Sequence, residues 1–260
     1  MTWILPPKKI VLGKDDLHVW RTDLDEPIET VRRLERVLSP DERQRAGRFL
    51  CSSDSCRFVV ARSFVREVLG TYLNVAAGEV QFAAGPHGKP SLRIKPGMES
   101  VEFNLSHSDS IALLAISHQP VGIDVERVRQ DPEHDSIAQQ FFSPAEVCEY
   151  YRYQKADRPR AFTRFWTRKE AYIKATGQGL TIPLRSFTVS STPQNLSLPL
   201  VNRALCSASM WKMCGIDVGP GFEAAIVYQG EIKQFLLLRG RPYAAPVALD
   251  KERKSNREKF

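Results

Sequence analysis

The chain of 260 residues contains no apolar run that approaches the ~18 residues of a membrane-spanning helix. The apolar stretch Ile111–Ile116 has the length of a buried strand. Near the N-terminus, Pro6-Pro7 and Lys8-Lys9 interrupt the apolar residues, so we expect no signal peptide. The composition, with 42% hydrophobic and 26% charged residues, is that of a globular protein. We therefore expect a cytoplasmic protein without membrane contact.

Cysteine is scarce, and its five copies form no zinc motif. The number is odd, no Cys-x-x-Cys pair occurs, and no histidine stands at zinc-ligand spacing. This argues against structural zinc and is typical of reduced thiols in a cytoplasm. A Walker A loop is absent too, because the turn Gly85–Pro90 ends in Lys-Pro rather than Lys-Ser or Lys-Thr.

Lysine is missing between Arg32 and Arg66, where nine arginines stand with four acidic residues. Arginine binds phosphate oxygens through two parallel N–H groups, so this stretch is either a solvated helix face or a phosphate site. More than half of the net charge of +7 comes from residues 239–260, which hold seven basic and three acidic residues. We interpret them as a solvated, mobile tail on a mildly basic body.

The same helix-start signal occurs in both halves of the chain. Ser39-Pro40-Asp41-Glu42 and Ser143-Pro144-Ala145-Glu146 each combine a serine cap, a proline and the glutamate of a capping box. A second helical pattern then ends in glycine, over 58–69 before Gly70 and over 162–176 before Gly177. Strand patterns follow over 80–83, 91–94 and 111–117 in the first half, and over 186–190, 196–200 and 222–228 in the second.

This repeated order of elements indicates a duplicated fold. We expect an α/β (α+β) protein with an N-terminal half over 1–119, a C-terminal half over 120–238 and the tail over 239–260, with the seam near residues 118–120. A cleft between two such halves is a natural ligand site.

The segment Val121–Glu126 predicts a strand that carries Asp124 and Glu126 on one face and Ile123 and Val125 on the other. Two adjacent carboxylates repel each other. The pair is therefore either solvated on an exposed strand or bound to a hard cation such as Mg²⁺.

A helical pattern over 162–176 places Trp166, Glu170 and Lys174 on one stripe, which Phe162 extends. Glu170 and Lys174 in this order also suit an ordinary surface ion pair, worth only about 0.2–0.5 kcal/mol. A stripe that begins with two aromatic residues should face inward, however. Charged groups carried inward need a partner or a ligand, which favours a functional role.

The third segment of interest is the turn around Lys89 together with Phe103–Ser108, where we expect a strand to break at Ser106 and His107. Each residue alone is more typical of a turn than of a ligand. In combination, the Arg, Lys, Ser and His groups can bind phosphates, and Asp124, Glu126 and Glu170 can complete a magnesium site. Such a set suits displacement at phosphorus.

The chain resembles the Sfp-type 4′-phosphopantetheinyl transferases from about Val19 to Tyr228, in the branch that ends its motif in Trp-x-x-Lys-Glu-Ala. Four motifs in the family's order carry the resemblance: residues 88–90 (GKP), 103–108 (FNLSHS), 121–126 (VGIDVE) and 166–177 (WTRKEAYIKATG). The resemblance implies the 4′-phosphopantetheinyl transferase fold, a pseudo-dimer of two similar α/β halves in one chain.

The resemblance also implies an activity: transfer of the phosphopantetheine arm of coenzyme A to a carrier-protein serine, with release of adenosine 3′,5′-bisphosphate. Asp124, Glu126 and Glu170 would hold Mg²⁺, or Mn²⁺ in its place. Asp124, Glu170 and Lys174 would be the catalytic residues, with Glu170 as the general base, directly or through water. Lys174 would face the pyrophosphate.

The coenzyme's 3′-phosphate and adenosine end would contact Lys89, His107, Arg45 and Arg57, with help from Ser106. In one respect the chain departs from the family pattern. Asp41 and Glu42 stand where many members carry a basic residue, which leaves open which of Arg43, Arg45 and Arg48 contacts phosphate.

The implied partners are coenzyme A and an apo acyl or peptidyl carrier protein of fatty-acid, polyketide or nonribosomal peptide synthesis. We expect a monomer that binds no nucleic acid. Two alternatives remain at this point: a Mg²⁺-dependent nuclease using the same acids, and a basic nucleic-acid-binding protein using the arginines and the tail.

Overall fold

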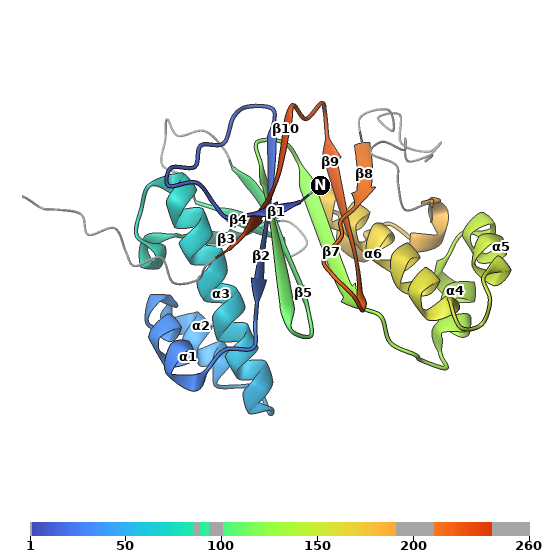
Figure 1. Ribbon diagram of the computed structural model, residues 1–260, viewed down its shortest axis with the longest axis horizontal. Coiled ribbons are helices and arrows are strands. Elements are labelled where there is room, and N and C mark those ends of the chain that lie inside the picture. Colours follow the sequence, from blue (N-terminus) through green and yellow to red (C-terminus); the bar gives the residue numbers. More distant parts are fainter. Residues whose placement is uncertain (1, 86–88, 94–100, 191–210, 241–260) are drawn as a thin grey trace, which may run out of the picture.

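The computed structural model describes residues 2–85, 89–93, 101–190 and 211–240 (Figure 1). Its larger sheet has the strand order β1-β10-β2-β6-β5. Strand β10 runs parallel to β1 and β2, whereas β6 is antiparallel to both of its neighbours, β2 and β5. The bounds are Trp3–Ile4 (β1), Asp16–Asp23 (β2), Glu102–Ser108 (β5), Ile111–Ser117 (β6) and Gln234–Arg239 (β10).

A smaller antiparallel sheet, β7-β9-β8, packs against the larger one. It contains Val121–Arg127 (β7), Trp211–Gly215 (β8) and Phe222–Gln229 (β9). The core between the sheets follows the alternation of side chains along each strand. Leu113 and Ala115 of β6 and Ile123 and Val125 of β7 all point into it.

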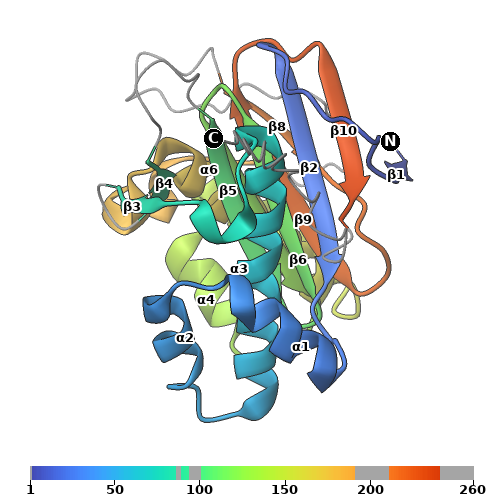
Figure 2. The same ribbon diagram turned by 90° about the vertical axis from the view of Figure 1, so that its left-hand side faces the viewer.

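Helices cover the outer faces of both sheets (Figures 1 and 2). The larger sheet is covered by Ile28–Leu34 (α1), Pro40–Ala46 (α2) and Ser52–Leu73 (α3), and the smaller one by His134–Phe141 (α4), Pro144–Arg152 (α5) and Arg158–Thr176 (α6). Short elements complete the described residues: Phe82–Ala84 (β3), Pro90–Leu92 (β4), and the 3₁₀ helices Glu35–Val37 (η1), Ala77–Glu79 (η2), Gly179–Thr181 (η4) and Leu184–Ser186 (η5). The expected α/β fold of two halves is confirmed, with helices and a sheet in each.

The last described strand returns to the first sheet. β10 lies between β1 and β2, although residues 234–239 follow the smaller sheet in the chain. The two halves expected from the sequence are thus interleaved at this strand. Residues 241–260, which make up nearly all of the expected tail, lie outside the described residues.

Both predicted helix starts are confirmed. Ser39 and Ser143 cap α2 and α5, and in each case the backbone N–H of the serine donates a hydrogen bond to the carboxylate of the glutamate three residues later. Gly177 ends α6 in the left-handed conformation with φ 68°, as expected. Gly70 does not end its helix. α3 continues to Leu73, and Asn74 is the left-handed cap.

Two other expectations about secondary structure are wrong. Ser106 and His107 lie within β5 rather than at a break, because residues 102–108 pair continuously with β6. Residues 186–190 form no strand: η5 ends at Ser186, and no run of strand residues follows up to residue 190. The strand expected over 196–200 lies outside the described residues.

The structure also bears on the expectations about membrane spans and about cysteines. None of the helices in the described part of the chain combines the length and apolar character that a membrane span requires. The cysteines in that part, Cys51, Cys56, Cys148 and Cys214, are free thiols.

Gly122 allows α6 to lie directly on β7. A Cβ atom at this position would overlap the carbonyl oxygen of Ala171 and the backbone nitrogen of Ala175. We expect Gly122→Ala to lower the free energy of unfolding by about 3 kcal/mol, since backbone atoms cannot move aside as side chains do. The melting temperature should fall by roughly 6–12 °C.

Gly78→Ala is the matched control, because its Cβ would come no closer than 3.9 Å to a neighbouring atom, the oxygen of Val37. Thermal unfolding of the two variants and the wild type measures the difference. Equal melting temperatures for all three would show that α6 and β7 do not need this close approach.

Candidate active site

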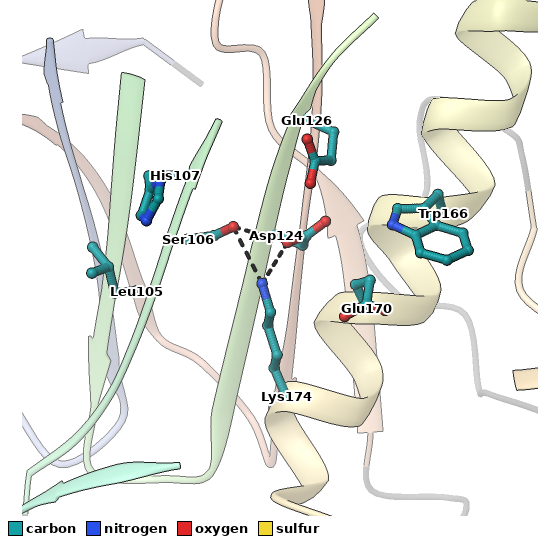
Figure 3. A pocket seen from close by; sticks show the side chains of 8 residues that line it. All are labelled: Leu105, Ser106, His107, Asp124, Glu126, Trp166, Glu170 and Lys174. Atoms are coloured by element: carbon teal, nitrogen blue, oxygen red, sulfur yellow. Dashed lines mark hydrogen bonds and ion pairs between the residues drawn. The ribbon is translucent and has the colours of Figure 1, made fainter. Parts of the chain in front are cut away.

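A pocket opens where β5 of the larger sheet, β7 of the smaller sheet and α6 meet (Figure 3). Its walls come from distant parts of the sequence, joined by the packing of the two sheets. The residues that line it are Leu105, Ser106, His107, Asp124, Glu126, Trp166, Glu170 and Lys174.

The pattern of each element explains why these side chains meet. Along β7, Ile123 and Val125 enter the core between the sheets, so Asp124 and Glu126 face α6 and the pocket. On α6, Trp166, Glu170 and Lys174 follow one another at four-residue steps, so one helix stripe lines the pocket. The inward stripe predicted from the sequence is therefore present, and Asp124 is not on an exposed strand, since it is only 2% exposed.

Asp124 lies at the centre of the polar contacts. Its Oδ1 atom accepts hydrogen bonds from Ser106 Oγ at 2.8 Å and from Lys174 Nζ at 2.5 Å, the latter an ion pair. Its buried Oδ2 atom has no hydrogen-bond partner among the described residues. Burial raises the pKa of Asp124, and the Lys174 ammonium opposes that rise.

The two glutamates of the pocket hold protons more readily than free carboxylates do. Burial raises the pKa of Glu126, although the Ser108 hydroxyl, which donates to its Oε2 atom at 2.7 Å, acts in the opposite direction. Burial also raises the pKa of Glu170, and the charge of Asp124 raises it further. The negative charges of the three carboxylates therefore repel one another, and under this condition a cation is bound favourably.

The side chains as they stand do not enclose a metal ion. No group of three His, Cys, Asp or Glu residues in the described part of the chain is close enough to hold one. Instead, the Lys174 ammonium is the cation next to Asp124, and Figure 3 shows Glu126 above Asp124 and Glu170 to the right of Lys174.

The first half contributes Ser106 and His107 from β5. Partial burial lowers the pKa of His107, and the nearby charges of Lys174 and Arg45 lower it further. Arg45 is therefore close enough to influence the pocket; its guanidinium lies 5.2 Å from the centre of the Phe58 ring. An anion placed beside these groups would meet several positive or donor groups at once.

Lys89 and Arg57, the other two residues expected to bind the coenzyme, do not line the pocket. Lys89 Nζ donates to the carbonyl of Val121 at 3.2 Å, and burial lowers the pKa of this lysine. Arg57 donates to both oxygens of Asp25 and to Asp109 Oδ1 at 2.9 Å. A phosphate at Arg57 would have to compete with these two carboxylates.

Sequence reasoning missed the role of Ser108 and Asn104, which hydrogen bond to β7. The signal was present, because residues 104, 106 and 108 share one face of a strand. The expectation of a break at Ser106 concealed that periodicity.

Comparisons with known proteins agree with the motifs. Residues 120–210 match the 4′-phosphopantetheinyl transferase superfamily, and residues 25–119 match the N-terminal region of 4′-phosphopantetheinyl transferases. The chain is 37% identical to the 4′-phosphopantetheinyl transferase HetI of Nostoc sp. over 74% of its own length and 81% of that protein. It is 32% identical to Sfp of Bacillus subtilis, over 66% of its own length and 76% of Sfp.

Among solved structures, a holo-acyl-carrier-protein synthase of Thermotoga maritima matches 43% of the chain and 63% of that protein, with 19% identity and a TM-score of 0.34.

Neither HetI nor Sfp is a nuclease or a nucleic-acid-binding protein by name. The sequence matches cover both walls of the pocket and extend through β5, β7 and α6. The chain belongs to the 4′-phosphopantetheinyl transferase family.

Proposed function

We propose that the chain transfers the 4′-phosphopantetheine arm of coenzyme A to a serine of an apo carrier protein. The observation that carries this proposal is the pocket itself, where Asp124, Glu126, Glu170 and Lys174 meet Ser106 and His107. Acidic groups for a cation thus lie beside donor groups for phosphate. The relatives at 32–37% identity bear the name of this activity.

The three acidic side chains have the donor chemistry of a divalent-cation site, although their positions in the described part of the chain do not yet enclose an ion. Asp124 Oδ2 is buried without a hydrogen-bond partner among the described residues. Burial is the main cause that raises the pKa of Glu170, and the charges of the neighbouring carboxylates raise it further. Carboxylate oxygens are the ligands that Mg²⁺ prefers, and Mn²⁺ accepts the same set. We propose Asp124, Glu126 and Glu170 as the ligands. When bound, the ion would offset the charge of the pyrophosphate of coenzyme A.

The side chains around the ion can perform the proton transfer. The carrier serine oxygen attacks the phosphorus that bears pantetheine, and the bond from this phosphorus to the bridging oxygen breaks. Adenosine 3′,5′-bisphosphate leaves with that oxygen. Glu170 accepts the serine proton, directly or through water. The Lys174 ammonium neutralises charge that develops on the leaving phosphate.

We propose that the adenosine end of coenzyme A contacts His107 and Ser106 in the pocket, with Lys89, Arg45 and Arg57 around it. Of the two arginines in the last turn of α2, Arg43 and Arg45, the latter is favoured because its charge reaches His107. Arg43, by contrast, donates to the carbonyl of Leu38 at 2.7 Å. Arg57 contributes only if a phosphate displaces Asp25 or Asp109.

One experiment tests the proposed activity and its metal requirement together. We expect the purified chain, given coenzyme A and Mg²⁺, to increase the mass of an apo carrier by one phosphopantetheine arm, as measured by intact-protein mass spectrometry. EDTA should abolish the gain, and added Mg²⁺ or Mn²⁺ should restore it. A carrier whose acceptor serine is replaced by alanine is the control. No gain with acyl and peptidyl carriers alike would refute the proposal.

The same proposal extends to the setting of the reaction. One chain supplies both walls of the pocket, so we propose that the monomer is active. We also propose that it acts in the cytoplasm, on carriers of fatty-acid, polyketide or nonribosomal peptide synthesis. Comparing kcat/KM across a panel of such carriers would identify the preferred one.

A further inference from the structure

The edges of the two sheets meet at β5 and β7 without a backbone ladder between them in the described residues. Three side chains of β5 take its place. Asn104 Oδ1 accepts from the Ile123 N–H at 2.8 Å, Ser106 Oγ from Val125 at 3.3 Å and Ser108 Oγ from Arg127 at 3.1 Å. Each pair is separated by 19 residues, so alternate residues of one strand match alternate residues of the other. We refer to Asn104, Ser106 and Ser108 as the β5 polar row.

The two serines of the β5 polar row differ from Asn104 in what they donate. A serine oxygen that accepts an N–H still carries one proton to give. Ser106 Oγ donates it to Asp124 Oδ1 at 2.8 Å, and Ser108 Oγ donates it to Glu126 Oε2 at 2.7 Å. Both acceptors are carboxylates that line the pocket. Asn104 is bonded to the backbone of Ile123 and to neither of them.

Each of these bonds fixes one oxygen of a carboxylate and thereby the orientation of the other. The second oxygen of Asp124, Oδ2, is buried and has no hydrogen-bond partner among the described residues. The arrangement therefore links the register of the two sheets to the direction in which the acidic groups face. If the β5 polar row served only to join the sheets, acceptors alone would be enough, and no hydroxyl would have to contact Asp124 or Glu126.

We propose that Ser108 is a positioning residue that orients Glu126 for cation binding, and that the β5 polar row carries the alignment of the two halves into the acidic cluster. This inference rests on the proposed function, because it assumes that the cluster binds a divalent ion. Ser108 is the better probe of the two serines. It is buried and lies outside the pocket lining, whereas Ser106 lines the pocket and also accepts from Lys174 at 3.2 Å.

The test measures Mn²⁺ affinity in the presence of coenzyme A, from the electron paramagnetic resonance signal of free Mn²⁺. Ser108→Ala should weaken Mn²⁺ binding about tenfold, as is typical when a group that orients a metal ligand is removed. At saturating Mg²⁺ the KM for coenzyme A should remain that of the wild type. Ser108→Thr keeps the hydroxyl and should restore the affinity, and Ser108→Cys, a weaker donor of similar size, should give an intermediate value.

Asn104→Ala is the matched control within the β5 polar row. Like Ser108→Ala it leaves one backbone N–H of β7 without its acceptor, which costs stability. Unlike Ser108→Ala, it removes no hydrogen bond to a carboxylate. We expect both variants to have lower melting temperatures, but Asn104→Ala to bind Mn²⁺ within twofold of the wild type.

Several outcomes would overturn the proposal. They are unchanged Mn²⁺ affinity in Ser108→Ala, equal weakening in Asn104→Ala and Ser108→Ala, and a wild-type protein that binds no Mn²⁺. If the wild type binds Mn²⁺ but loads no carrier, the proposed activity fails, while the positioning role of Ser108 is still decided by the affinities.

Discussion

Glu170→Gln is expected to bind coenzyme A but to lose most phosphopantetheine transfer, with kcat reduced by about 10²–10⁴-fold. The amide has nearly the same shape as the carboxylate, so the pocket should keep its form. It cannot accept the serine proton as a carboxylate does, and it is a poorer ligand for a divalent ion. Both proposed roles of Glu170 are lost in a single change.

Isothermal titration with coenzyme A measures binding, and the mass of the carrier over time measures transfer. Glu29→Gln, an exposed substitution on α1, is the matched control and should behave as the wild type. If purified Glu170→Gln loads a carrier at the wild-type rate, neither the base nor the ligand role assigned to this residue is correct.

Lys169→Met is expected to lower the free energy of unfolding at least as much as Gly122→Ala does. Lys169 stands next to Glu170 in the chain, yet it points away from the pocket and is fully buried. Its Nζ atom contacts Glu146 Oε2 at 2.8 Å and donates to the carbonyls of Leu184 at 2.7 Å and Phe187 at 2.8 Å. This ammonium therefore holds α5 and residues 184–187 against α6.

Removal of one partner of a buried ion pair leaves the other charge uncompensated, which costs about 3–5 kcal/mol. Glu146 would remain as that charge. Burial already raises its pKa, and without Lys169 the charge that chiefly opposes this rise would be lost. Urea unfolding of Lys169→Met measures the loss. Below the melting temperature, the folded fraction should still transfer phosphopantetheine, because the pocket keeps all its residues.

A double-mutant cycle with Glu146→Gln separates the ion pair from simple packing. If the two residues act as a pair, the double variant should lose much less stability than the sum of the single losses. A loss below about 1 kcal/mol for Lys169→Met, the size of an exposed ion pair, would show that the buried pair does not anchor this region.

Local patterns in the sequence predict the face of each element that carries the chemistry. Alternation along Val121–Glu126 separates Asp124 from the core residues, and four-residue spacing brings Glu170 and Lys174 onto one stripe. These predictions succeed because they depend only on the geometry of a strand or a helix. The helix starts at Ser39 and Ser143 are predictable for the same reason.

Partners that are distant in the chain could not be predicted in this way. Nothing near Arg57 in sequence indicates that Asp25 and Asp109 will engage it, and nothing near Lys169 identifies Glu146. The rule that a glycine ends a helix places the end of α3 at Gly70, which is too early. Residues 71–73 continue the helix, and Asn74 adopts the left-handed conformation that ends it.

The position of β10 has a consequence for how the molecule is made. Residues 1–119 emerge from the ribosome long before residues 234–239. Strand β2 nevertheless pairs on one side with β10, and β10 is the only partner of β1 among the described residues. Until β10 is synthesised, the N-terminal half therefore has an unpaired strand edge at β2. Swapping that half between related proteins would succeed only if the matching final strand travelled with it.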